Sequence, residues 1–133
     1  MSYSATAILR QEHEAILKML DASETTAQKI EKGGIVPPET LAGLLEFLRL
    51  FADRCHHGKE EDLLFPKLGE KGFPTNAGPV AVMLYEHEQG RALIRKMVDA
   101  SEACSAGNSN AARDWAAAAH AYVALLRAHI DKE

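Results

Sequence analysis

Three clusters of glycine and proline divide the chain into four long segments, and these breaks constrain the fold more than any other feature. They lie at residues 32–38, 69–79 and 105–109. Such clusters end helices and start new ones, and no segment between them shows sustained β alternation. The sequence predicts helices over about 4–32, 38–69, 79–106 and 109–133. Short connections between long helices favour an all-α, up-down-up-down four-helix bundle.

Composition narrows the class of protein further. A length of 133 residues suits one domain, spanning 1–133, and a hydrophobic content of 47% excludes disorder. The net charge of -4, without a basic run, gives no reason to expect nucleic acid or an anionic membrane as partner. No apolar stretch reaches the ~20 residues of a membrane span, and no signal peptide is visible. Two separated cysteines are typical of a reduced chain, so we expect a cytoplasmic monomer or homodimer.

Three of the predicted helices carry a histidine within their apolar stripe. Residues three, four, seven and eight apart share one face of a helix. His13 lies among leucines and isoleucines of the first helix, and His87 lies in the middle of the stripe on the third. His129 continues the apolar face of the fourth helix, and Glu133 follows it by four residues. His120, nine residues earlier, falls on the opposite face, where we expect solvent.

The second helix allows two assignments. One stripe passes through Phe51 and places His57 and Glu61 inward; the other passes through Ala52 and places His56 and Glu60 inward. The second stripe would also bury Lys59, which is costly unless the ammonium group is paired. We therefore favour His57 and Glu61 over His56 and Glu60.

The histidines fall at one level of the predicted bundle. At ~1.5 Å per residue, alternating helix directions bring His13, His57 and His87 within roughly 6 Å of one another along the bundle axis. Buried carboxylates beside them need a compensating cation. Imidazole and carboxylate together suit iron or another transition metal better than magnesium or calcium. Six inward ligands exceed the four of a structural zinc site, and bridging carboxylates allow two metals in a bundle core.

Four short motifs make the sequence resemble the hemerythrin-like, or HHE cation-binding, domain family. HHGKEEDLLFP, from His56 to Pro66, is similar to the family's HxxxE motif with its Leu-Phe-Pro ending. RQEHEAI around His13, VMLYEHEQGR around His87 and HIDKE at the end resemble its other three helices. The likeness spans almost the whole chain, and the joint pattern is more specific than any single piece.

The resemblance implies a di-iron centre, which an oxo group can bridge, with zinc or manganese as substitutes. The family's motifs place His13, His57, His87 and His129 as terminal ligands, with Glu61 and Glu133 bridging the metals. Two departures stand out. Met83 occupies the position of a second third-helix histidine, and Glu133 follows its histidine at four residues instead of five. Because Glu133 is the last residue given, we expect the final turn, 130–133, to be ordered by metal.

The same resemblance indicates two classes of function. One is a protein that binds or senses oxygen, nitric oxide or iron. The other is an enzyme, either an oxidase or peroxidase or an iron donor in iron–sulfur repair. Since Met83 leaves one metal with an open position, we expect fast oxidation in place of reversible oxygen carriage. A third reading, an interaction module with one zinc ion, conflicts with the number of ligands.

Overall fold

The computed structural model describes residues 5–74, 76–108 and 110–132, with side chains at 7–74, 76–108 and 110–131. This part of the chain contains helices and no strand, which confirms the all-α class. Its elements are α1 (Ala5–Glu31), α2 (Pro38–Phe47), η1 (Leu48–His57), η2 (Glu60–Leu64), α3 (Phe65–Glu70), α4 (Gly78–Ser105) and α5 (Ala111–Lys132).

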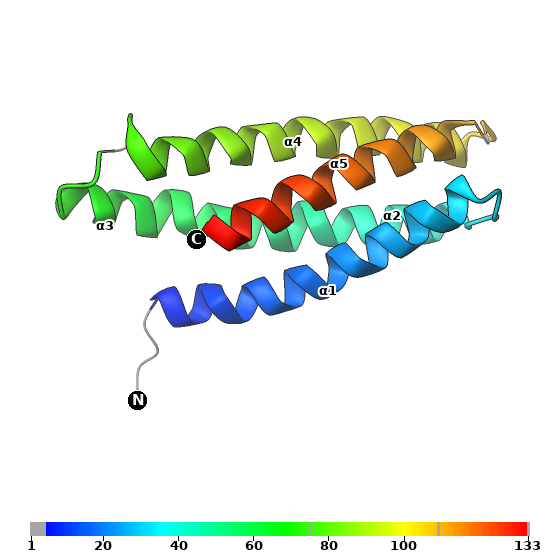
Figure 1. Ribbon diagram of the computed structural model, residues 1–133. Coiled ribbons are helices and arrows are strands. Elements are labelled where there is room, and N and C mark those ends of the chain that lie inside the picture. Colours follow the sequence, from blue (N-terminus) through cyan, green and yellow to red (C-terminus); the bar gives the residue numbers. More distant parts are fainter. Residues whose placement is uncertain (1–4, 75, 109, 133) are drawn as a thin grey trace.

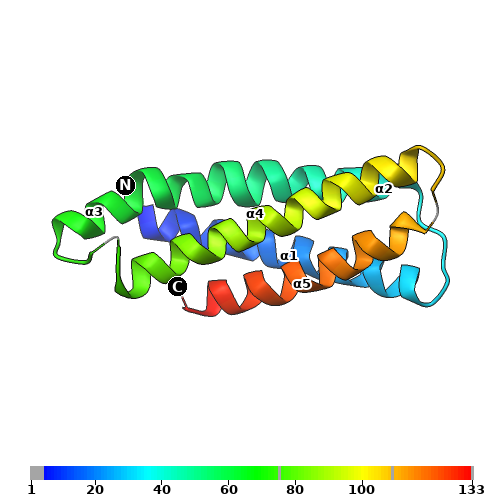
Figure 2. The ribbon, with the colours of Figure 1, turned by 90° about the horizontal axis from the view of Figure 1, so that it is seen from above.

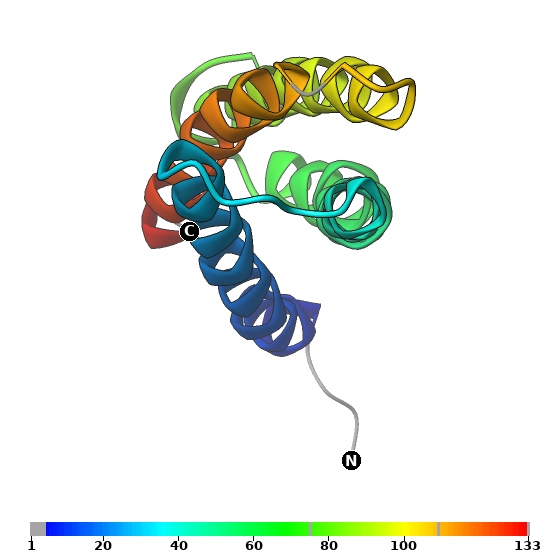
Figure 3. The ribbon, with the colours of Figure 1, turned by 90° about the vertical axis from the view of Figure 1, so that its right-hand side faces the viewer.

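The elements form four rods that lie side by side. The second rod, Pro38–Glu70, consists of α2, η1, η2 and α3 joined end to end. The α1–α2 and α4–α5 connections lie at one end of the molecule, and the α3–α4 connection lies at the other (Figure 1). α5 packs against both α4 and α1, and α2 packs against α4, as the two rotated views also show (Figures 2 and 3).

Proline and glycine set the helix boundaries. Pro38 opens α2 and Pro79 stands in the first turn of α4, where a missing N–H costs nothing. Gly33 follows α1 with a φ of 84°, and Gly107 follows α4 with a φ of 99°. These left-handed angles suit glycine and end a helix cleanly. The Asn108 side chain accepts a hydrogen bond from the N–H of Asn110 (3.1 Å) just before α5, whereas Ser109 lies outside the described residues.

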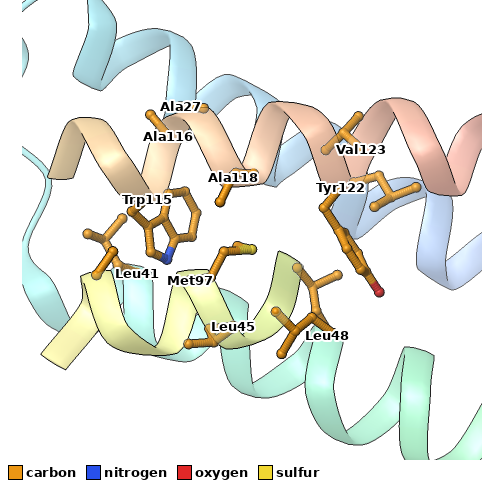
Figure 4. Close-up of a cluster of buried hydrophobic side chains, with 14 of the residues drawn as sticks. Ala27, Leu41, Leu45, Leu48, Met97, Trp115, Ala116, Ala118, Tyr122 and Val123 are labelled. Carbon is orange, nitrogen blue, oxygen red and sulfur yellow. The ribbon is translucent and has the colours of Figure 1, made fainter. Parts of the chain in front are cut away.

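Two apolar clusters of different size lie at different levels along the rods. The larger one contains Trp115, Tyr122, Met97 and Leu48 among others (Figure 4). The smaller one is built on Phe65, Val80 and Met83. On the second rod and on α4, the chain passes from one cluster to the other through buried histidine and glutamate residues. Those residues are His56, His57 and Glu60 on the second rod and His87 on α4.

The first part of the second rod, up to Ala52, buries a different stripe from the one that we favoured. Leu41, Leu45, Leu48 and Ala52 are buried, whereas Phe51 is only partly covered. The objection to this stripe was the burial of Lys59. The structure removes that objection, because the Lys59 side chain is 43% exposed and its Nζ lies 2.6 Å from Glu12 Oε2. Leu17 of α1, one of the leucines near His13 that the periodicity predicts to face inward, is exposed.

Part of the second rod is a π-helix, with hydrogen bonds between residues five apart. The N–H of Gly58 donates to the carbonyl of Asp53, and the N–H of Phe65 donates to that of Glu60. Such turns are longer than the 3.6 residues of an α-helix. The buried face therefore takes in both His56 and His57 and then Glu60. In this region a periodicity of 3.6 no longer indicates which side chains point inward.

No helix in the described ranges combines the length and the apolar character that a membrane crossing requires.

The Leu48 side chain should contribute strongly to stability, since it lies fully buried in the larger cluster. We expect Leu48→Ala to lower the free energy of unfolding by about 2–5 kcal/mol, from lost burial and the cavity left behind. Leu63→Ala on the same rod should change it by less than about 0.5 kcal/mol, because Leu63 is 63% exposed. Urea denaturation of the two variants provides the comparison. Equal losses would contradict the assignment of the buried face.

Candidate metal centre

Potential metal ligands form two groups that share Glu60. The first group contains His13, His56 and Glu60, and the second contains His57, Glu60, His87 and His129. Within each group the candidate nitrogen and oxygen atoms lie within 4.8 Å of one another. The groups draw on all four rods: α1, the second rod, α4 and α5. All members except His13 are buried.

Glu60 lies between the two groups. Its Oε1 atom is 3.3 Å from His87 Nε2 and 3.7 Å from His56 Nε2. The residue is 1% exposed. A carboxylate so deeply buried is costly unless positive charge or a metal compensates it. Because Glu60 lies next to both sets of imidazoles, its carboxylate could contact two cations at once.

Four of the histidines face a carboxylate through their Nδ1 atoms. The Nδ1–oxygen distances are 3.1 Å for His56 and Glu12, 3.8 Å for His57 and Asp53, 2.8 Å for His87 and Glu61, and 3.2 Å for His129 and Glu86. An ionised carboxylate can only accept, so in the three pairs within hydrogen-bond distance the proton belongs on Nδ1 and the lone pair on Nε2. This arrangement orients imidazoles for metal binding and makes them more basic ligands.

Two cations hold three of these carboxylates in place. Arg91 on α4 contacts Asp53 through Nε (2.8 Å) and Glu61 through its terminal nitrogen (2.6 Å), and Lys59 contacts Glu12. Burial alone would raise the pKa of Asp53 and Glu61. Hydrogen bonds with histidine and Arg91 outweigh it, so both pKa values lie below the ordinary ones. These carboxylates are therefore ionised at neutral pH, as orienting acceptors must be.

The converging Nε2 atoms fit a cation. His87 Nε2 and His129 Nε2 lie 3.1 Å apart, and each bears a lone pair if Nδ1 is protonated. His57 Nε2 is buried and has no hydrogen-bond partner among the described residues. Burial, reinforced by the neighbouring histidines, lowers the pKa of His57 to about 4, so its ring is neutral at pH 7. Several neutral imidazoles with one carboxylate are a donor set for transition metals.

The predicted site residues fall into three sets in the structure. His13, His57, His87 and His129 come together, and the less favoured pair His56 and Glu60 joins them. Glu61 lies outside both groups, 25% exposed, against Arg91 and His87 Nδ1. Glu133 lies outside the described residues.

Two other residues, His120 and Tyr85, lie away from these groups. His120 is partly exposed and pairs with Glu31 (2.7 Å). The side chain of Tyr85 is exposed to solvent.

The sequence analysis treated His56/Glu60 and His57/Glu61 as alternatives, whereas the π-helical rod buries His56, His57 and Glu60 together and leaves Glu61 partly exposed. Asp53, four residues before His57, could have been found from helical spacing. Glu12 and Glu86 could not, because each serves a histidine on another rod.

The helical architecture and the buried histidine–glutamate groups define a metal-binding helical protein. The chain belongs to the hemerythrin HHE cation-binding domain family, which matches residues 4–133. The match covers nearly the whole chain, including all members of the two ligand groups.

Curated relatives are distant and carry no assigned function. The chain is 25% identical over 125 residues to uncharacterized proteins of Mycobacterium tuberculosis and Mycobacterium bovis. The aligned part is 94% of this chain and 48% of each relative, so the chain spans about half the length of the curated relatives it matches. No solved structure matches it.

The metal-free protein should lose stability in mild acid because His57 is buried in its neutral form. Its pKa is about 4 in the folded chain, below the ordinary value of 6.5 that applies in the unfolded chain. The stability is complete above pH 6.5 and is lost as pH falls from there toward 4, since only the unfolded chain takes up the proton. We expect a loss of about 2 kcal/mol between pH 7 and pH 5. Urea denaturation of the chelator-treated protein at each pH measures it.

His57→Leu serves as the control for this pH dependence. The leucine keeps an apolar group in the same buried place but cannot titrate. Its unfolding free energy should therefore vary less between pH 7 and pH 5 than that of the parent protein. An identical pH slope for the two proteins would show that His57 is not the group responsible.

Proposed function

We propose that this protein holds two iron ions in a hemerythrin-like centre and uses them to bind or sense oxygen or nitric oxide. The observation that carries the proposal is Glu60, which belongs to both groups of potential ligands. A shared carboxylate at the meeting point of two imidazole sets is typical of dimetal sites in helical bundles. Zinc and manganese could occupy the same donors as substitutes.

The structure supports an assignment of roles within this centre. His13, His56 and Glu60 would hold one ion, and His57, His87 and His129, with Glu60, would hold the other. Glu60 takes the bridging role in place of Glu61, which fits better as the acceptor that orients His87. Glu133 stays a candidate ligand for the bridging position.

The two groups differ in ligand number. The first offers three ligands and the second offers four. Met83, at the position of the family's further histidine, lines a pocket together with His13 and Glu60. The ion of the first group would thus have open positions facing that pocket. This asymmetry supports a ligand-binding role over a purely structural one, since structural sites are closed.

The family match and the rod arrangement support the up-down-up-down bundle as the topology of this domain. In such a bundle, residues near the start of α1 and α4 reach the same level as residues near the end of the second rod and α5. The four rods then supply ligands to one layer. We place the protein in the cytoplasm, where its two free cysteines would stay reduced.

Glu60→Gln tests the shared carboxylate. After anaerobic reconstitution with ferrous iron, the parent protein should contain about two iron ions per chain by elemental analysis. Glu60→Gln should retain less than one, because both ions lose a charged ligand. Binding of about one zinc and no iron by the parent would refute the di-iron proposal.

Glu61→Gln is the matched control, one residue along the same rod. It should keep two iron ions at saturating metal and bind them with about 10–100-fold lower affinity, as expected for a residue that orients a ligand. If Glu61→Gln empties the centre and Glu60→Gln does not, the bridging role belongs to Glu61.

Oxygen should oxidise the reduced protein without reversible carriage. The three-ligand group borders an accessible pocket, so small gases reach it directly. Stopped-flow mixing of the ferrous protein with oxygen should give one fast optical change that persists when oxygen is removed. An absorption band that disappears on deoxygenation and returns with oxygen would show a carrier instead.

A further inference from the structure

A pocket of about 260 Å³ opens beside the first ligand group. It lies between the first turns of α1 and α4 and the end of the second rod. His13 and the buried Glu60 line its inner part, and the exposed Arg10 lines its solvent side. A water molecule takes about 30 Å³ in the liquid, so this space corresponds to roughly eight to ten non-hydrogen atoms. A diatomic gas needs far less.

The walls between these two ends are apolar. They are formed by Leu9, Leu64, Leu68, Val80 and Met83, with the ring of Phe65. Val80, Met83 and Phe65 also make up the smaller apolar cluster, so the wall is a packed surface. Such a lining favours an aliphatic or aromatic body, whose transfer from water into the pocket is favourable.

Arg10 is the one cationic side chain lining the pocket, and it forms no ion pair within the described part of the chain. A guanidinium group binds carboxylates with two parallel hydrogen bonds. The inner end is buried between apolar walls, so a carboxylate of the ligand placed there would lose its hydration. A ligand with one acidic end is therefore oriented, with its acid toward Arg10 and its apolar end toward His13 and Glu60.

We propose that this pocket binds a small organic monocarboxylate, with its carboxylate on Arg10 and its aliphatic or aromatic end beside the first ligand group. The inference rests on the proposed function in one respect only: that the ligand's apolar end would lie next to a metal ion with open coordination positions. Binding itself depends on Arg10 and the apolar walls. An organic molecule, as well as a dissolved gas, would then bind next to the metal centre.

Hexanoate, with eight non-hydrogen atoms, is a suitable probe. Isothermal titration calorimetry should detect binding in the millimolar range or tighter, to both the metal-free and the iron-loaded protein. Hexanol, which keeps the chain and lacks the charge, should bind at least tenfold more weakly. Acetate, which keeps the charge and lacks the chain, should also bind at least tenfold more weakly.

Arg10→Gln should weaken hexanoate binding about tenfold or more, whereas Arg95→Gln should leave it within twofold. Arg95 is an exposed arginine of α4 that does not line the pocket. Leu68→Trp, at a partly buried wall position, should fill the pocket and abolish binding. Circular dichroism checks that each variant folds, and elemental analysis should find the iron content of all three unchanged.

The outcomes separate this inference from the proposed function. Two iron ions per chain without hexanoate binding would overturn the pocket proposal and leave the di-iron centre in place. Hexanoate binding to a protein that takes up no iron would do the reverse. Binding that requires iron and is equal in Arg10→Gln would place the carboxylate on the metal, and it would also overturn the orientation proposed here.

Discussion

The burial of one carboxylate, Glu60, is the constraint on which the rest of the site depends. Its oxygen lies within 3.3 Å and 3.7 Å of imidazoles from two groups, deep between apolar clusters. Such a group is tolerated only where positive charge is nearby. Burial keeps the nearby His57 ring neutral, so this imidazole lends the Glu60 carboxylate little positive charge. A bound cation resolves this imbalance, and the fold supplies its ligands from every rod.

Charged side chains surround these ligands and fix the orientation of the histidine rings. Arg91 holds Asp53 and Glu61, which face His57 and His87, and Lys59 holds Glu12, which faces His56. All of these contacts except the one between Asp53 and His57 join different rods, so the helix packing and the ligand geometry fix each other. Metal binding and folding are coupled in such an arrangement, because ligands from four rods converge only in the folded chain.

The sequence predicts the helices and their buried faces more accurately for some elements than for others. Glycine and proline clusters located the four rods, and 3.6-residue periodicity placed His13, His87 and His129 on buried faces. The same periodicity misjudged the second rod, because π-turns there shift the buried face and because Lys59 reaches Glu12 at the surface. Contacts across rods, such as Glu86 with His129, leave no local pattern and needed the structure.

Because of the π-helical stretch, a deletion within the second rod should disturb the site more than a deletion in a connection between rods. Within a helix, each residue turns the following side chains by about 100°. Loss of a single residue from Leu48–His57 would swing Glu60 and the end of the second rod away from α4 and α1. The same loss in the connection between α3 and α4 would be absorbed by a loop. Relatives of this protein should therefore vary in length between the rods and keep a fixed count along this stretch.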